Sequence, residues 1–143
     1  MPIGPSDVAL NKAAIVERCI RRLGEEYAAD PDLEACTHID AMTLNIARAC
    51  QACIDLAMHL VAPRRLGMPQ SSGEAFALLR AAGLIPASLD DAMRRMTGFR
   101  HIAIHQYKEL DNAVLRYIAE RGWRDLVAYC EALGLRVEAD RHG

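Results

Sequence analysis

The stretch from Thr37 to Val61 constrains the fold more than any other part of the sequence. It contains neither glycine nor proline, and Pro63 follows it. Its apolar residues recur every three or four positions and cover most of the helical circumference. They are Ile39, Met42, Ile46, Cys50, Cys53, Ile54, Ala57, Leu60 and Val61. We therefore expect a long central helix that other helices cover on several sides.

The polar residues of this stretch fall on one narrow side. Arg48, Gln51, Asp55 and His59 lie within roughly 80° of arc at 100° per residue. Buried polar groups need partners, so this polar seam is either satisfied inside one bundle or faces a subunit interface or a cleft. Asp55 and His59, four residues apart, could pair in a polar core or bind a metal ion.

Capping residues and breakers divide the rest of the chain into further helices. The first should start at Ser6 or Asp7 and run to about Ala29, and a fifth should start at Asp111 or Asn112 and break at Gly122. The remaining expected helices are 74–82, 86–107 and 123–133. The fold class is all-α, with five or six helices in one domain over residues 1–143. Residues 1–5 and 136–143 should form loose termini.

Composition narrows the class of protein. Hydrophobic residues make up 52% of the chain and charged residues 25%, as in globular proteins. The net charge of −2 argues against a high-affinity, non-specific nucleic-acid binder, although the pairs Arg64–Arg65, Arg94–Arg95 and Arg100–His101 could form a local basic cleft. Five cysteines without framework spacing, and no apolar run that would span a bilayer, predict reduced thiols in a cytoplasmic protein. The pair Cys50 and Cys53 should be core residues.

Chemistry-bearing side chains are concentrated between Met96 and Tyr107. Here Arg100, His101, His105 and Tyr107 stand among aliphatic residues. An arginine offers a fork of donors that fits phosphate oxygens, and a histidine exchanges protons near neutral pH. Together they could cleave a phosphodiester without a metal. Five positions separate Arg100 from His105, which places them about 140° apart on an ideal helix. A local distortion, long side chains or a second chain must bring them together.

The spacing Arg100, four residues, His105, one residue, Tyr107 resembles the R-x4-6-H signature of HEPN domains, and more narrowly the R-x4-H-x-Y form of the HepT toxins. The usual string there is close to GFRN-x-x-x-H-x-Y, and His101 stands in the common asparagine position. Further runs that are similar to HepT proteins are residues 52–57, 66–69, 74–76 and 84–86. The resemblance extends over roughly residues 7–133.

This resemblance implies an antiparallel HEPN bundle that forms a homodimer, with the motif helices facing each other across one cleft. The implied activity is metal-independent cleavage of RNA and not DNA, with no cofactor and no metal site. His105 would act as general base or acid, Arg100 would hold the phosphate, and His101 would support them. A MntA-like nucleotidyltransferase antitoxin would inhibit this toxin by adding AMP to Tyr107.

Two other interpretations compete with the toxin ribonuclease. The bundle could be a non-catalytic binding module that only scaffolds a nucleotidyltransferase partner, with the motif as a docking surface. It could also be a metal-dependent hydrolase built on Asp55 and His59.

Overall fold

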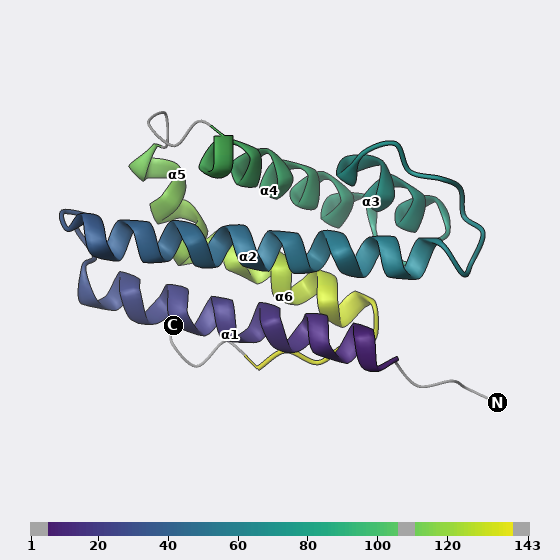
Figure 1. Cartoon of the computed structure of the whole chain (residues 1–143), viewed down its shortest axis with the longest axis horizontal. Helices are drawn as coiled ribbons and strands as arrows, with labels where there is room; N and C mark the ends of the chain where they lie inside the picture. Colours follow the sequence, from purple (N-terminus) through teal and green to yellow (C-terminus); the bar gives the residue numbers. More distant parts are fainter. Residues whose placement is uncertain (1–5, 106–110, 139–143) are drawn as a thin grey trace.

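The computed structural model describes residues 6–105 and 111–138, and over these residues every regular element is a helix (Figure 1). The predicted all-α fold class is therefore confirmed. The elements are α1 (Asp7–Ala29), α2 (Cys36–Val61), α3 (Ser72–Ala81), α4 (Ala87–His105), α5 (Asn112–Tyr117), the π-helical segment η2 (Ile118–Gly122) and α6 (Trp123–Ala132).

Helix α2 is the central element, as its sequence predicted. It runs antiparallel to α1 along almost its whole length, and it also contacts α3, α4 and α6 (Figure 1). Its residues Met42, Cys53, Leu56 and Ala57 are completely buried. The carbonyl of Cys53 accepts a hydrogen bond of 2.9 Å from the hydroxyl of buried Tyr129 in α6. A helix that is apolar over most of its girth is thus covered on several sides by other helices.

Side-chain caps mark the starts of α1, α3 and α5. Ser6 accepts a hydrogen bond from the backbone N–H of Ala9, and Ser71 accepts one from Glu74. Asp111 does the same for Ala113 at the start of α5. These bonds satisfy donors that have no partner within the first turn, so the predicted start of the first helix at Ser6 or Asp7 and of the fifth at Asp111 or Asn112 are both confirmed.

Gly122 does not break the chain between the last two helices, contrary to the prediction. It ends η2, and the backbone continues directly into α6. A β-carbon at this position would lie 3.3 Å from Cγ1 of Ile118 and 3.4 Å from a ring carbon of Tyr117. The glycine therefore makes room for a close approach inside a wider helical turn, and its flexibility is not needed to stop the helix.

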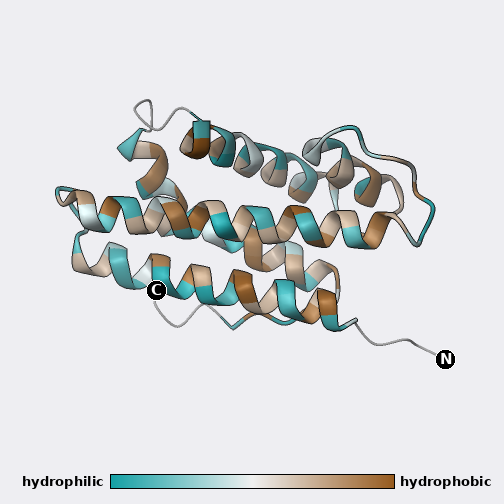
Figure 2. Cartoon of the chain, in the orientation of Figure 1, coloured by the Kyte–Doolittle hydropathy of each residue, from teal (hydrophilic) through white to brown (hydrophobic). Residues whose placement is uncertain are grey.

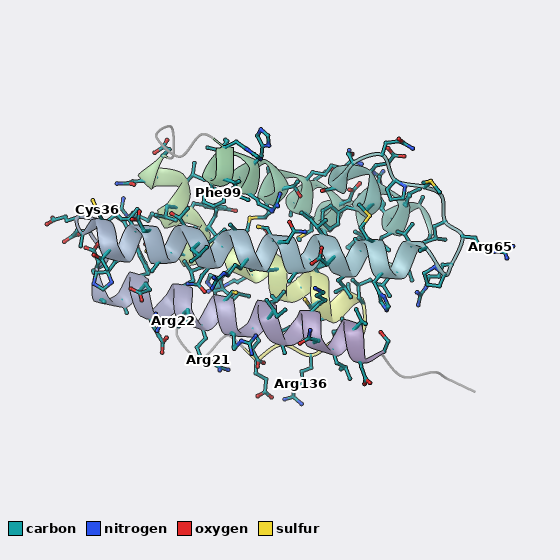
Figure 3. The ribbon with its side chains drawn as sticks, viewed as in Figure 1. Arg21, Arg22, Cys36, Arg65, Phe99 and Arg136 are labelled. Atoms are coloured by element: carbon teal, nitrogen blue, oxygen red, sulfur yellow. The ribbon has the colours of Figure 1, made fainter. Side chains whose placement is uncertain are left out.

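The segment after α6 packs against α1 as far as Glu138. Leu135 and Val137 are 2% and 4% exposed, and the backbone N–H of Glu138 donates a hydrogen bond of 2.7 Å to Glu17. Arg136 alternates with these residues and points away from the bundle (Figure 3). The loose tail expected from residue 136 is thus packed over residues 136–138, because two aliphatic side chains there reach the core.

Hydrophobic and hydrophilic residues are interspersed along the long helices α1 and α2 (Figure 2). Within residues 6–105 and 111–138, no helix combines the length and the apolar character needed to cross a membrane.

Candidate active site

The first half of α4 is held in place by a buried carboxylate. Asp90 is fully buried, and it accepts a hydrogen bond of 2.8 Å from Nε of Arg94 one turn later. Arg80 in α3 approaches its other oxygen at 3.4 Å. A buried charge is tolerated only when it is paired in this way. This network was not predicted from the sequence, although the spacing of four residues between Asp90 and Arg94 could have suggested it.

The second half of α4 places Arg100 at the surface of the core. Met93 and Met96 on the same side are buried, and the thiol of Cys50 in α2 donates to the carbonyl of Met96 at 3.6 Å. Burial raises the pKa of Cys50 to about 12, while the nearby positive charge of Arg100 acts in the opposite direction. The guanidinium therefore lies close to α2, beside a thiol that stays neutral. Phe99, next to Arg100, lies between α4 and α2 (Figure 3).

Arg100 lacks the partner that a structural arginine would have. Its Nε is buried and has no hydrogen-bond partner among the described residues. Asp55, the acid in the polar seam of α2, is paired with Lys12 at 3.1 Å. A buried donor without an acceptor costs about 1–3 kcal/mol. The site thus contains a cation that the described part of the fold does not neutralise.

The polar seam of α2 is satisfied mainly by α1. Asp55 accepts hydrogen bonds from Lys12 of α1 and from Gln51 one turn earlier. His59 shares a hydrogen bond of 2.8 Å with Ser6. Among the described residues, no group of three or more acidic, histidine or cysteine side chains could hold a metal ion. The hydrolase built on Asp55 and His59 is therefore not supported, because each side chain is engaged by a residue at the start of α1.

Both motif histidines lie on the solvent side of the last turns of α4. His101 and His105 are exposed, and their ring centroids are 4.7 Å apart with an angle of 44° between the ring planes. Arg100 is half-buried toward α2, and the described structure contains no hydrogen bond between Arg100 and His105. The structure therefore brings the two histidines together and leaves Arg100 on another side of the helix, as the 140° separation predicted. We overlooked that His101 and His105 are four residues apart and must share a face.

Tyr107, the expected site of modification, lies outside the described residues, as does the end of the helix expected to reach it. The structure describes α4 as far as His105, two positions before Tyr107.

The predicted basic cleft does not form from the three arginine clusters. Arg94 is engaged by Asp90, and Arg64 donates to the carbonyl of Leu60 at 3.2 Å. Arg65 points outward from the loop between α2 and α3, at the other end of the bundle from the last turn of α4 (Figure 3). Of the described arginines in these three clusters, Arg100 is the one that lies within the motif.

The cysteines fit the predicted role in the core. Cys50 and Cys53 are at most 1% exposed. A hydrogen bond with Cys130, together with burial, raises the pKa of Cys53 well above its ordinary value. Such thiols are neutral and unreactive near pH 7. Burial also raises the pKa of the Tyr129 hydroxyl.

The fold matches solved toxin structures of the HEPN class. One, a tri-AMPylated HEPN toxin from Shewanella oneidensis in complex with an MNT antitoxin, is 34% identical, with a TM-score of 0.87 over 91% of this chain and 98% of that chain. Another, a toxin–antitoxin structure with AMP-PNP, is 33% identical, with a TM-score of 0.86 over 90% of this chain and 98% of that chain. Fold and motif thus define an all-helical, HEPN-type toxin.

Sequence comparison gives the family. The Ribonuclease HepT-like family matches residues 13–133. The mRNA nuclease HepT of Shewanella oneidensis is 34% identical over 129 residues, which are 90% of this chain and 97% of that protein. The chain belongs to the ribonuclease HepT-like family. The predicted family, fold and ribonuclease class are therefore confirmed.

Proposed function

We propose that this protein is the toxin of a toxin–antitoxin pair and cleaves RNA with Arg100 and His105. The observation that carries the proposal is the buried, unpartnered Nε of Arg100 on the same last turns of α4 that carry the exposed imidazoles of His101 and His105. A structural arginine would have an acceptor in the fold, as Arg94 has in Asp90. A cation without one supports a role toward an anionic ligand, and a phosphodiester is the anion that a ribonuclease binds.

The chemistry follows from the side chains. His105, as general base, would remove the proton from a ribose 2′-hydroxyl, and the resulting oxygen would attack the adjacent phosphorus. The bond from phosphorus to the 5′-oxygen of the next nucleotide would break, and an imidazolium would return a proton to that oxygen. Arg100 would offset the negative charge that develops on the phosphate oxygens. The need for a 2′-hydroxyl explains the expected preference for RNA over DNA, and mRNA is the substrate class that the curated relative's name suggests.

The geometry favours a homodimer as the active form. Arg100 lies toward α2, while His105 is exposed on another side of α4. Large apolar side chains are exposed beside them, since Ile102 is 37% and Ile104 is 51% exposed. An apolar surface next to a divided site supports an interface, across which Arg100 of one copy would approach His105 of the other.

A nucleotidyltransferase antitoxin would regulate the protein. The first structural relative is an AMPylated toxin bound to an MNT antitoxin. We propose that the partner transfers AMP from ATP to the Tyr107 hydroxyl and releases pyrophosphate. The added phosphate would place negative charge two residues from His105 and compete electrostatically with RNA for Arg100.

Cleavage of a defined RNA by the purified protein tests the proposal. We expect cleavage by the wild type, in the presence of a chelator, and its loss in the variants His105→Ala and Arg100→Ala. The same variants should lose toxicity when expressed in a growing culture. If wild type and Arg100→Ala arrest growth equally, or neither does, the motif is a docking surface and the scaffold interpretation is correct. Mass spectrometry after incubation with the partner and ATP should find AMP on Tyr107.

A further inference from the structure

The two neighbouring histidine rings of α4, which are tilted against each other, form a feature that cleavage itself does not require. General acid–base chemistry needs one imidazole within reach of the substrate, but His101 and His105 present two rings with centroids 4.7 Å apart on the same solvent face. No hydrogen bond or ion pair joins either ring to another residue that the structure describes. Their nitrogen lone pairs are therefore not engaged by the described part of the chain.

Two imidazoles four residues apart on a helix are a known arrangement for a metal ion. The spacing places both rings on one face, one turn apart, so that a single ion can be bound by a nitrogen of each. Imidazole is a preferred ligand of zinc, copper and nickel. Because both rings are exposed in the single chain, the other coordination sites of a bound ion are open to water there.

We propose that His101 and His105 bind a zinc-type transition-metal ion as a two-histidine chelate and that this ion switches off RNA cleavage. The second part rests on the proposed function, because it takes His105 as the proton-transferring group. A ring nitrogen that donates its lone pair to a metal cannot accept a proton from a 2′-hydroxyl. Among the described residues, no third ligand-type side chain joins the two histidines in a metal-binding group, so binding should be reversible.

The described chain offers few other groups that would compete for the ion. Four of the five cysteines are buried, and Cys36 is the exposed one. His38 faces Glu26, and His59 faces Ser6. A Cys36→Ser background removes the exposed thiol, and His59→Gln provides a matched change of one histidine at a distant site.

Calorimetric titration with Zn²⁺ tests the site without any assay of activity. In the Cys36→Ser background, we expect saturable binding that weakens at least tenfold in His101→Gln and in His105→Gln. His59→Gln should bind zinc as the background protein does. A double variant, His101→Gln with Ile104→His, keeps the number of imidazoles in α4 but not their spacing, and it should bind as weakly as His101→Gln alone. Circular dichroism checks that every variant folds. Unchanged affinity in His101→Gln, or full affinity in the double variant, would overturn the site.

A cleavage assay tests the regulatory part. Zn²⁺ should inhibit the background protein with a midpoint that matches the calorimetric affinity, and excess chelator should restore cleavage. The residual cleavage by His101→Gln should resist at least tenfold more zinc. A metal-independent ribonuclease acting on the same RNA controls for effects of zinc on the substrate.

The outcomes separate this inference from the proposed function. Zinc binding that requires both histidines, in a protein that never cleaves RNA, would uphold the site and refute the ribonuclease mechanism. RNA cleavage by a protein that binds no zinc, or that cleaves equally well when saturated with zinc, would uphold the mechanism and overturn this inference.

Discussion

The two halves of α4 differ in whether their charged side chains have partners in the fold. In the first half, Asp90 is fully buried and is bonded to Arg94 and to Arg80 of the neighbouring helix. In the second half, Arg100 has a buried donor without an acceptor, and His101 and His105 are exposed and contact each other. One helix therefore contains a paired ionic network and, within two turns of it, charged and titratable groups that have no hydrogen-bond partner in the described fold.

The difference separates charges that hold the fold from charges that remain for a ligand. A buried carboxylate must be paired for the chain to fold, so Asp90 should affect stability and not chemistry. A partly buried guanidinium with an unpaired donor lowers stability, so Arg100 should act on a ligand and not on folding. Substitutions in the two halves should therefore have effects of different kinds, which makes the comparison testable.

The largest effect should come from His105→Ala. Because the ring is exposed, its removal should leave the melting temperature nearly unchanged while the single-turnover rate of RNA cleavage falls by about 10²–10⁴-fold. Rates measured beside His59→Ala, which removes a histidine of α2, provide the control. A fall of less than tenfold would assign the proton transfer to another group.

Asp90→Ala should act on stability instead. Removing the acid leaves Arg80 and Arg94 without their shared partner and opens a cavity, so the free energy of unfolding should fall by about 3–5 kcal/mol. Urea denaturation followed by circular dichroism measures this change. The fraction that stays folded should cleave RNA at the wild-type rate per molecule, and a specific loss of chemistry would show that the two halves are coupled.

Arg100→Met should show the reverse behaviour. The cleavage rate should fall by about 10²–10³-fold, because phosphate stabilisation is lost. The free energy of unfolding should stay the same or rise by about 1 kcal/mol, since the unpartnered donor is replaced by an apolar side chain. Arg95→Met, at an exposed position on the same helix, is the matched control. Marked destabilisation by Arg100→Met would mean that Arg100 is structural.

The smallest effect should be the difference in the free energy of unfolding between substitutions of the adjacent residues Arg94 and Arg95. Arg94→Met should lower the free energy of unfolding by about 1 kcal/mol, because Arg94 is half-exposed and its pair with Asp90 is partly screened. Arg95→Met should change it by less than about 0.5 kcal/mol, as is usual for exposed positions. Equal values for the two variants would remove the distinction between paired and free arginines in this helix.

The sequence predicted those parts of the molecule that depend on local periodicity. The length and burial of α2 follow from its apolar pattern, and the cap residues Ser6 and Asp111 mark helix starts where the structure has them. Pattern alone could not predict that Gly122 lies inside a π-helical turn, since that depends on how close Tyr117 and Ile118 approach. The packing of Val137 against the bundle is likewise a tertiary effect.

For the site, the sequence predicted which residues are involved but not all of their relative positions and hydrogen-bond partners. The angle between Arg100 and His105 was predictable from helical geometry, and so was the shared face of His101 and His105. The absence of an acceptor for Nε of Arg100 among the described residues was not, because it depends on which groups of the other helices approach the guanidinium. The spacing of residues within one helix does not predict which hydrogen-bond partners the other helices provide.

The neutral thiol of Cys50, which lies near Arg100, affects how RNA cleavage should depend on pH. Because burial raises the pKa of Cys50 to about 12, this thiol stays protonated near neutral pH and supplies no counter-ion to the guanidinium there. A change in pH therefore does not alter the attraction of Arg100 for phosphate by ionising Cys50. A rate profile with an inflection that Cys50→Ala abolishes would show that this thiol ionises after all.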